Sequence, residues 1–165
     1  MSTDIAKDLA RIADQERVLV FPRFDESTAW ELGCALRDAA LAHDVAVTID
    51  IRRGDQILFF YAMPGTNPSN ADWARRKRNV VELLHRSSYA VGLEYANKQS
   101  SIEASLGVPT RDYATHGGCF PIRVAGCGPI GTVTVSGLPQ REDHELVVEV
   151  LARMLDRDPA NLALD

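Results

Sequence analysis

The feature that most constrains the fold is a pair of apolar segments joined by a short turn. In residues 45–51, VAVTIDI, apolar and more polar side chains alternate, which is the period of a strand with one buried face. The turn RRGD, residues 52–55, leads directly into QILFFYAM, residues 56–63. A connection this short predicts an antiparallel hairpin. Because residues 56–63 are apolar at almost every position, we expect this strand to be central and covered on both faces.

A second hairpin is predicted near the C-terminal end. FPIRV, residues 120–124, and IGTVTV, residues 130–135, flank a connection that contains Gly126 and Gly128. A further apolar run, RVLVF at residues 17–21, predicts a fifth strand. The other periodic segments predict helices at about residues 5–12, 25–42, 71–98 with a bend at its two adjacent serines, 100–107 and 140–156.

These elements predict an α+β fold: one antiparallel five-stranded sheet flanked by helices, in an α/β/α sandwich. The sequence has no internal repeat, low-complexity tract or linker, so residues 1–165 are expected to form a single domain. On the clearest strands, polar side chains alternate with apolar ones. One sheet face is therefore partly polar, and we expect it to lie against a subunit partner or a pocket. Its polar members are Thr48, Asp50, Thr132 and Thr134.

The charge balance bears on the choice of partner. The chain carries 18 Lys and Arg against 23 Asp and Glu, and this net charge of -5 gives no electrostatic reason to bind nucleic acid or an anionic membrane. The opening residues, MSTDIAKDLARIADQ, lack the apolar core of a signal peptide, and no stretch is long enough to span a bilayer. Three irregularly spaced cysteines fit a reducing compartment. We therefore expect a cytoplasmic protein.

The residues that follow the helical middle of the chain carry a family resemblance. GGCFPIRVAGCGPIGTVTVSG, residues 117–137, resembles the signature of the GlcG/HbpS-like proteins, which are often described as haem-degrading domains. The string VSGLPQREDHELV, with WARRKRNVV upstream, is similar to a short branch of that superfamily. The resemblance implies a five-stranded antiparallel sheet flanked by helices, homo-oligomers assembled from dimers, and haem or another cofactor as ligand. A fold by itself does not define an activity.

A strand-to-helix turn is the first candidate for a ligand site. Ser136 and Gly137 end a predicted strand, and a helix follows. Backbone N–H groups at the start of a helix lack partners within the helix and attract anions, so a carboxylate, propionate or phosphate could bind at this turn. The alternative is structural: Gly137 supplies the turn, and Asp143 only complements the helix dipole.

A glycine-rich loop is the second candidate. His116 precedes Gly117 and Gly118, directly before a predicted strand. Two glycines allow a close approach between backbone and ligand, and an imidazole can act as an axial ligand, a metal ligand or a general base. His144, near the start of the last helix, completes the site if the loop and the helix converge. The structural alternatives are a loop histidine bonded to a carbonyl and a solvent-exposed His144.

A lysine on an apolar helical face is the third candidate. In WARRKRNVVELL, residues 73–84, Lys77 shares a face with Trp73 and several aliphatic side chains. Such a lysine either extends past the edge of the face into solvent or reaches into a pocket, where it would bind an anionic ligand with Arg76 as a second cation. The four basic residues 75–78 spread around the helix of an acidic chain and do not predict a nucleic-acid interface.

Two functions are consistent with these residues. The first is a small-molecule or cofactor binder, with haem as the cofactor that the resemblance implies. In this case we expect Lys77, His116, Asp143 and the turn at residues 136–137 to meet around one pocket. The second is a non-enzymatic oligomeric interaction or assembly protein, in which the same residues shape subunit interfaces. His116, Cys119 and Cys127 match no standard zinc spacing, so no metal site is predicted. Walker, Rossmann and nucleophile-elbow motifs are absent from the sequence, which therefore identifies no reaction.

Overall fold

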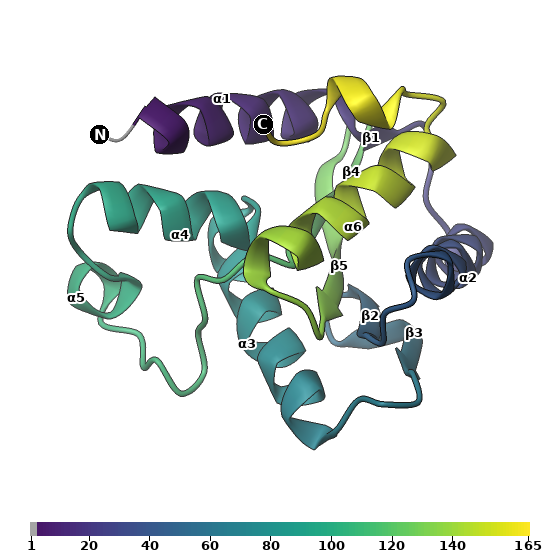
Figure 1. Ribbon diagram of the computed structural model, residues 1–165, viewed down its shortest axis with the longest axis horizontal. Helices are drawn as coiled ribbons and strands as arrows, with labels where there is room; N and C mark the ends of the chain where they lie inside the picture. The colour runs from purple at the N-terminus through teal and green to yellow at the C-terminus, as the bar shows by residue number, and fades with distance from the viewer. Residues whose placement is uncertain (1–2) are drawn as a thin grey trace.

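A five-stranded sheet with helices packed on both faces forms the centre of the computed structural model, which describes residues 3–165 (Figure 1). The strand order is β1-β4-β5-β2-β3. The strands are β1 (Val20–Phe21), β2 (Thr48–Arg53), β3 (Gln56–Ala62), β4 (Cys119–Val124) and β5 (Gly128–Ser136). Both predicted hairpins are present, since β2 pairs with β3 and β4 with β5 in antiparallel register. The α+β class is confirmed.

The prediction of a purely antiparallel sheet is wrong, because β1 runs parallel to β4, with Val20 beside Arg123. No hairpin joins these two strands, so no short turn forces them to run in opposite directions. The predicted strand at residues 17–21 is also shorter than expected. The first helix, α1 (Thr3–Val18), continues to Val18 and leaves only Val20 and Phe21 in the sheet.

The expectation for residues 56–63 is also wrong. Strand β3 lies at the edge of the sheet, where it pairs with β2 alone. Its odd-numbered side chains face α2 (Glu26–Ala42), where the Phe59 ring fills the space beside Gly33. Much of the strand nevertheless stays exposed, including Ile57 and Phe60. An apolar sequence on both faces thus marks an edge strand that this chain covers only in part.

The helices form two layers. On one face α2 packs with α6 (Gln140–Met154), and α3 (Pro68–Leu84) covers the other. The predicted helix at 71–98 is two helices, because α3 ends at His85 in a left-handed conformation and Ser87 caps the next helix. The remaining elements are α4 (Ser88–Asn97), α5 (Ile102–Leu106) and the 3-10 helix η1 (Pro159–Asn161).

The partly polar sheet face has a different cover from the one expected. Thr48, Thr132 and Thr134 are buried beneath α3 of the same chain. Asp50, also buried, accepts hydrogen bonds from Arg78 of α3 at 2.6 Å and from Arg52 at 2.9 Å. This face therefore lies mainly against an arginine-bearing helix of the same chain, and one of its members, Thr132, also lines a cavity of about 340 Å³.

The start of α2 follows from its sequence. Asp25 accepts from the Thr28 backbone at 2.9 Å, and the Thr28 hydroxyl accepts from the Asp25 backbone at 3.3 Å, which makes a capping box. The small and aliphatic residues that recur at helical spacing along this segment form the buried face of the helix. Its members are Ala29, Leu32, Gly33, Leu36 and Ala40.

We expect Asp25→Ala to lower the free energy of unfolding by about 1 kcal/mol, because the substitution removes the N-cap acceptor. Urea denaturation measures this change. Asp4→Ala, in the first turn of α1, provides a comparison in which a charge is removed from an exposed position. An Asp25→Ala variant as stable as the natural chain would contradict a stabilising cap.

Candidate functional site

A cavity of about 270 Å³ lies where α3 and α6 begin and β5 ends. It brings together five of the residues predicted for the ligand site, including the lysine, the loop histidine and the strand-to-helix turn. The lining residues are Asn67, Ser69, Asn70, Trp73, Lys77, His116, Ser136, Gly137, Leu138, Gln140 and Asp143. The sequence-based expectation that these distant segments converge is therefore met.

A buried ion pair forms one wall of this cavity. The Nζ atom of Lys77 lies 2.7 Å from Oδ2 of Asp143, and both side chains are less than 5% exposed. Asp143 also accepts from the backbone N–H of Leu138 at 2.9 Å and of Gly137 at 3.4 Å. Burial raises the pKa of Asp143, and the Lys77 charge and these hydrogen bonds oppose the rise. The carboxylate thus ties the turn before α6 to α3.

Of the two courses considered from the sequence, Lys77 takes the one that reaches into a pocket, because its side chain lines the cavity. Its ammonium group is buried instead of extending to solvent, and it already has an anionic partner within the protein. An ammonium group has three N–H donors. The contacts of Lys77 within residues 3–165 occupy two of them, with Asp143 and with the Val135 carbonyl at 3.3 Å. The third donor remains for a group that enters the cavity.

The two loop glycines are needed for packing against the protein itself. Gly118 has φ +131°, and a Cβ atom there would lie 2.4 Å from the Val135 carbonyl oxygen and 2.8 Å from Nζ of Lys77. A Cβ atom at Gly117 would lie 2.1 Å from the Gln140 carbonyl oxygen. The loop therefore lies directly against the ion pair and the first residue of α6. Because they lack a Cβ atom, its glycines allow the loop to pack closely against these residues of the cavity wall.

His116, which directly precedes these glycines in the chain, lines the cavity beside an aromatic ring. Its imidazole packs edge-on against Trp73 with ring centroids 5.1 Å apart. Burial, followed by the charges of Lys77 and Arg76, lowers the pKa of His116, so the ring is neutral at pH 7. Within residues 3–165 neither ring nitrogen has a hydrogen-bond partner, whereas Arg76 lies over Trp73 and donates to the Thr110 carbonyl.

The structure places His144 away from the cavity, in the core between α6 and α1. Its Nε2 atom lies 2.8 Å from Oε1 of Gln15, and its ring packs against Tyr89 and Phe120. Burial lowers the pKa of His144 to about 3. This histidine is neither solvent-exposed nor beside His116; its side chain links the first helix to the last.

Sequence reasoning missed the residues at the start of α3. Asn67 caps this helix and Asn70 closes the capping box, so their side chains reach the cavity together with Ser69. The signal was present as Asn67 followed by Pro68, since proline favours the first helical position. Gln140 was missed as well: its Oε1 accepts from the Gly117 backbone at 3.2 Å.

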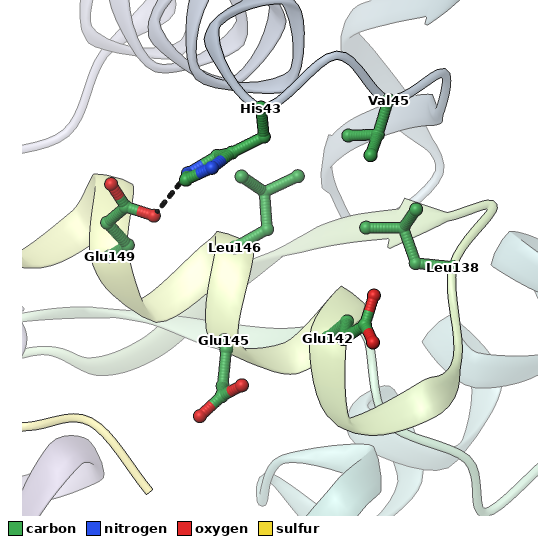
Figure 2. A pocket seen from close by; sticks show the side chains of 7 residues that line it. All are labelled: His43, Val45, Leu138, Glu142, Glu145, Leu146 and Glu149. Carbon is green, nitrogen blue, oxygen red and sulfur yellow. Dashed lines mark hydrogen bonds and ion pairs between the residues drawn. The ribbon is translucent and has the colours of Figure 1, made fainter.

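A second cavity, of about 340 Å³, lies along another side of α6 (Figure 2). Its floor is apolar, with Val45, Leu138 and Leu146. Glutamates of α6 line its rim, and Glu149 lies 3.0 Å from Nε2 of His43. None of the residues predicted for ligand binding lines this cavity.

The cysteines and histidines do not come together. Cys119 is buried, its thiol accepts from the Thr134 hydroxyl, and burial raises its pKa to about 12. Cys127 lies exposed between β4 and β5. Within the described residues no group of three His, Cys, Asp or Glu side chains could hold a metal ion. None of the helices described is long and apolar enough to cross a membrane.

The fold and the cavity define a class: a small α+β domain with a pocket at the junction of two helix starts and a buried ion pair in its wall. The model of the family "Haem degrading protein HbpS-like" matches residues 24–152, and the chain belongs to this family.

Three known proteins illustrate the relationship. The chain is 57% identical over 160 residues to a UPF0303 protein of Acidobacterium capsulatum, which covers 97% of both chains. The crystal structure of the Ybr137w protein is similar with a TM-score of 0.83 and 27% identity, over 90% of this chain and 87% of that one. A PduOC:heme complex shares the fold with a TM-score of 0.65 and 18% identity, over 81% and 94% of the respective chains.

Proposed function

We propose that the protein binds a compact anionic ligand, a small molecule with a carboxylate or phosphate group, in the cavity between the starts of α3 and α6. The observation that carries this proposal is the third N–H donor of Lys77, which belongs to a nearly fully buried ammonium group in the cavity wall. A buried donor without a partner is costly, so an acceptor is expected there.

The other groups around the cavity favour the same ligand class. The Ser136 hydroxyl and the His116 ring have no partner within residues 3–165 and can both donate. The Asp143 carboxylate is already engaged by Lys77 and two backbone N–H groups. Two helix starts add partial positive charge. A donor-rich cavity of this kind favours a ligand rich in acceptors, with Trp73 and Leu138 as its apolar contacts.

The cavity does not fit a whole haem group. Its volume of about 270 Å³ is at the lower limit of the roughly 300–1,000 Å³ cavities that enclose drug-sized ligands, and most of its lining residues are polar. A carboxylate fits, whereas a flat apolar macrocycle does not. The family description and the PduOC:heme complex support a haem-related role for the family; in this chain we assign the cavity to a smaller ligand.

We expect succinate to bind and its neutral diamide, succinamide, to bind at least about 10-fold more weakly, because a hydrogen bond to a charged group contributes about 1.5–3 kcal/mol. His116→Ala and Ser136→Ala should each weaken succinate binding by about 10-fold in isothermal titration calorimetry. His43→Ala, in the second cavity, is the matched control and should bind succinate normally. Equal binding of the two compounds would contradict the proposed ligand class.

The pH dependence of succinate binding has a defined sign. Because the pKa of His116 is lowered from 6.5, its ring stays neutral above pH 7 and affinity should be constant there. As the pH falls through this lowered pKa, the ring gains a positive charge, whereas the succinate carboxylates begin to take up protons in the same acidic range and lose charge. Because protonation of succinate affects both proteins alike, the affinity of the natural chain relative to that of His116→Ala should rise. Calorimetric titrations of both proteins at a series of pH values measure this ratio, and a ratio that falls with the pH would contradict this role of His116.

A haemin titration followed in the Soret band separates the small ligand from haem. A saturable band shift that His116→Ala abolishes would place haem against His116 and contradict the assignment to a compact ligand.

We further propose that the protein works in a cytoplasmic, reducing compartment, which its three free cysteines support.

A further inference from the structure

An apolar surface remains exposed on the edge strand and the helix beside it. It consists of Trp30 on α2, 64% exposed, and of Ile57, Phe60 and Tyr61 on β3, which are 55%, 45% and 36% exposed. We call these four residues the edge patch. The Trp30 ring packs edge-on against Phe59 at 5.7 Å, so Trp30 and the odd-numbered side chains of β3 form one surface, and Phe60 lies on the opposite face of the same edge strand. Figure 1 shows β3 at the end of the sheet, beside α2.

The edge strand lacks the features that normally protect such a strand from pairing. It is seven residues long, QILFFYA, and contains no charged residue and no proline. Only β2 pairs with it, so its other edge presents unpaired backbone N–H and C=O groups. In a protein that stays soluble, an edge of this kind is expected to be covered by a further strand.

The size of the edge patch fits a stable interface. An aromatic side chain can bury about 150–250 Å², so the exposed fractions of the edge patch amount to about 400 Å² of largely apolar surface. A partner in a standard interface contributes about 800 Å², of which roughly 55–65% is apolar. The edge patch supplies most of the apolar share, and the strand backbone supplies hydrogen bonds.

The sequence of β3 is complementary to itself in antiparallel pairing. When two copies pair symmetrically about Phe59, Ile57 of each copy lies opposite Tyr61 of the other, and Leu58 opposite Phe60. Residues opposite each other point to the same sheet face, so apolar side chains meet on both faces and no like charges are opposed. We propose that β3 pairs with β3 of a second copy of this chain, which gives a two-fold symmetric dimer with a continuous sheet. This inference is independent of the proposed ligand site.

Sedimentation equilibrium of the full chain tests the proposal. We expect the natural chain to form a dimer, or a multiple of it, and Phe60→Lys to raise the dissociation constant of the dimer by about 30-fold or more. Leu106→Lys is the matched control: Leu106 is 49% exposed but lies on α5, and its replacement should leave the mass unchanged. A monomeric natural chain, or a dimer that persists in Phe60→Lys, would overturn the proposal.

Two further variants keep the test decisive. Ile57→Thr retains a strand-favouring residue and should weaken the dimer even where Phe60→Lys fails to fold, as judged by circular dichroism. With Cys34 and Cys127 replaced by serine, a chain carrying Ile57→Cys and Tyr61→Cys should form disulfide-linked dimers on oxidation. These positions are too far apart along one strand to link within a chain. Monomers without intermolecular disulfides would overturn the proposed register.

Discussion

Replacement of Lys77 by methionine is expected to lower the free energy of unfolding by about 3–5 kcal/mol at pH 7, because it leaves the buried Asp143 carboxylate without a counter-ion. For a chain of this length, the melting temperature should fall by roughly 10 °C or more. Urea denaturation and calorimetry measure both changes. The double variant Lys77→Met with Asp143→Leu should lose less than the sum of the single variants, since neither charge is then left unpaired.

The loss in free energy of unfolding caused by Lys77→Met should become smaller as the pH falls. Burial already raises the pKa of Asp143, and loss of the Lys77 charge raises it further. The folded variant then binds a proton at a higher pH than the unfolded chain does, so its stability relative to the natural protein improves as the pH falls toward 4. Arg111→Met, which breaks an exposed ion pair with Asp72, should cost less than about 1 kcal/mol and serves as the control. A similar loss in the two variants would contradict the special role of the buried pair.

Gly118→Ala is expected to destabilise the protein by about 3 kcal/mol or more. The new Cβ atom would lie 2.4 Å from the Val135 carbonyl oxygen and 2.8 Å from Nζ of Lys77, and alanine is strained at φ +131°. Backbone atoms and a buried ion pair cannot move aside cheaply, so the clash adds to the strain. The change should appear in urea denaturation as a lower midpoint with an unchanged slope.

Gly126→Ala is the control that distinguishes backbone strain at a positive φ from a steric clash of the new Cβ atom. Gly126 has φ +78°, but a Cβ atom there meets no atom within 4 Å. This variant should therefore lose only about 1–2 kcal/mol, the cost of a left-handed conformation for alanine. Equal losses at the two positions would show that the loop can move away from the ion pair.

Local periodicity predicted which segments form helices and strands better than it predicted which strands lie side by side in the sheet. The buried face of α2 and the two hairpins follow from the side-chain spacing and short turns, which depend on adjacent residues. The parallel pairing of β1 with β4 depends on residues far apart along the chain, which no local pattern specifies. An apolar strand such as β3 has the same sequence pattern whether its own chain or another molecule covers it.

The candidate site was predicted in part for the same reason. The strand-to-helix turn, Lys77 and His116 carried local signals, and the structure brings them to one cavity. The pairing of Lys77 with Asp143 joins two helices and could not be deduced from either one. The sequence showed His144 only as a polar residue near a helix start, although its Gln15 partner on α1 places it in the core.

The pairing of β1 with β4 has a consequence for how the chain is made. Val20 leaves the ribosome long before its neighbour Arg123 exists, and β2 must likewise wait for β5. Until then the β2–β3 hairpin is the part of the sheet that can form, with its apolar edge strand open to solvent. Synthesis therefore passes through an intermediate with an exposed apolar edge strand, a feature that favours aggregation.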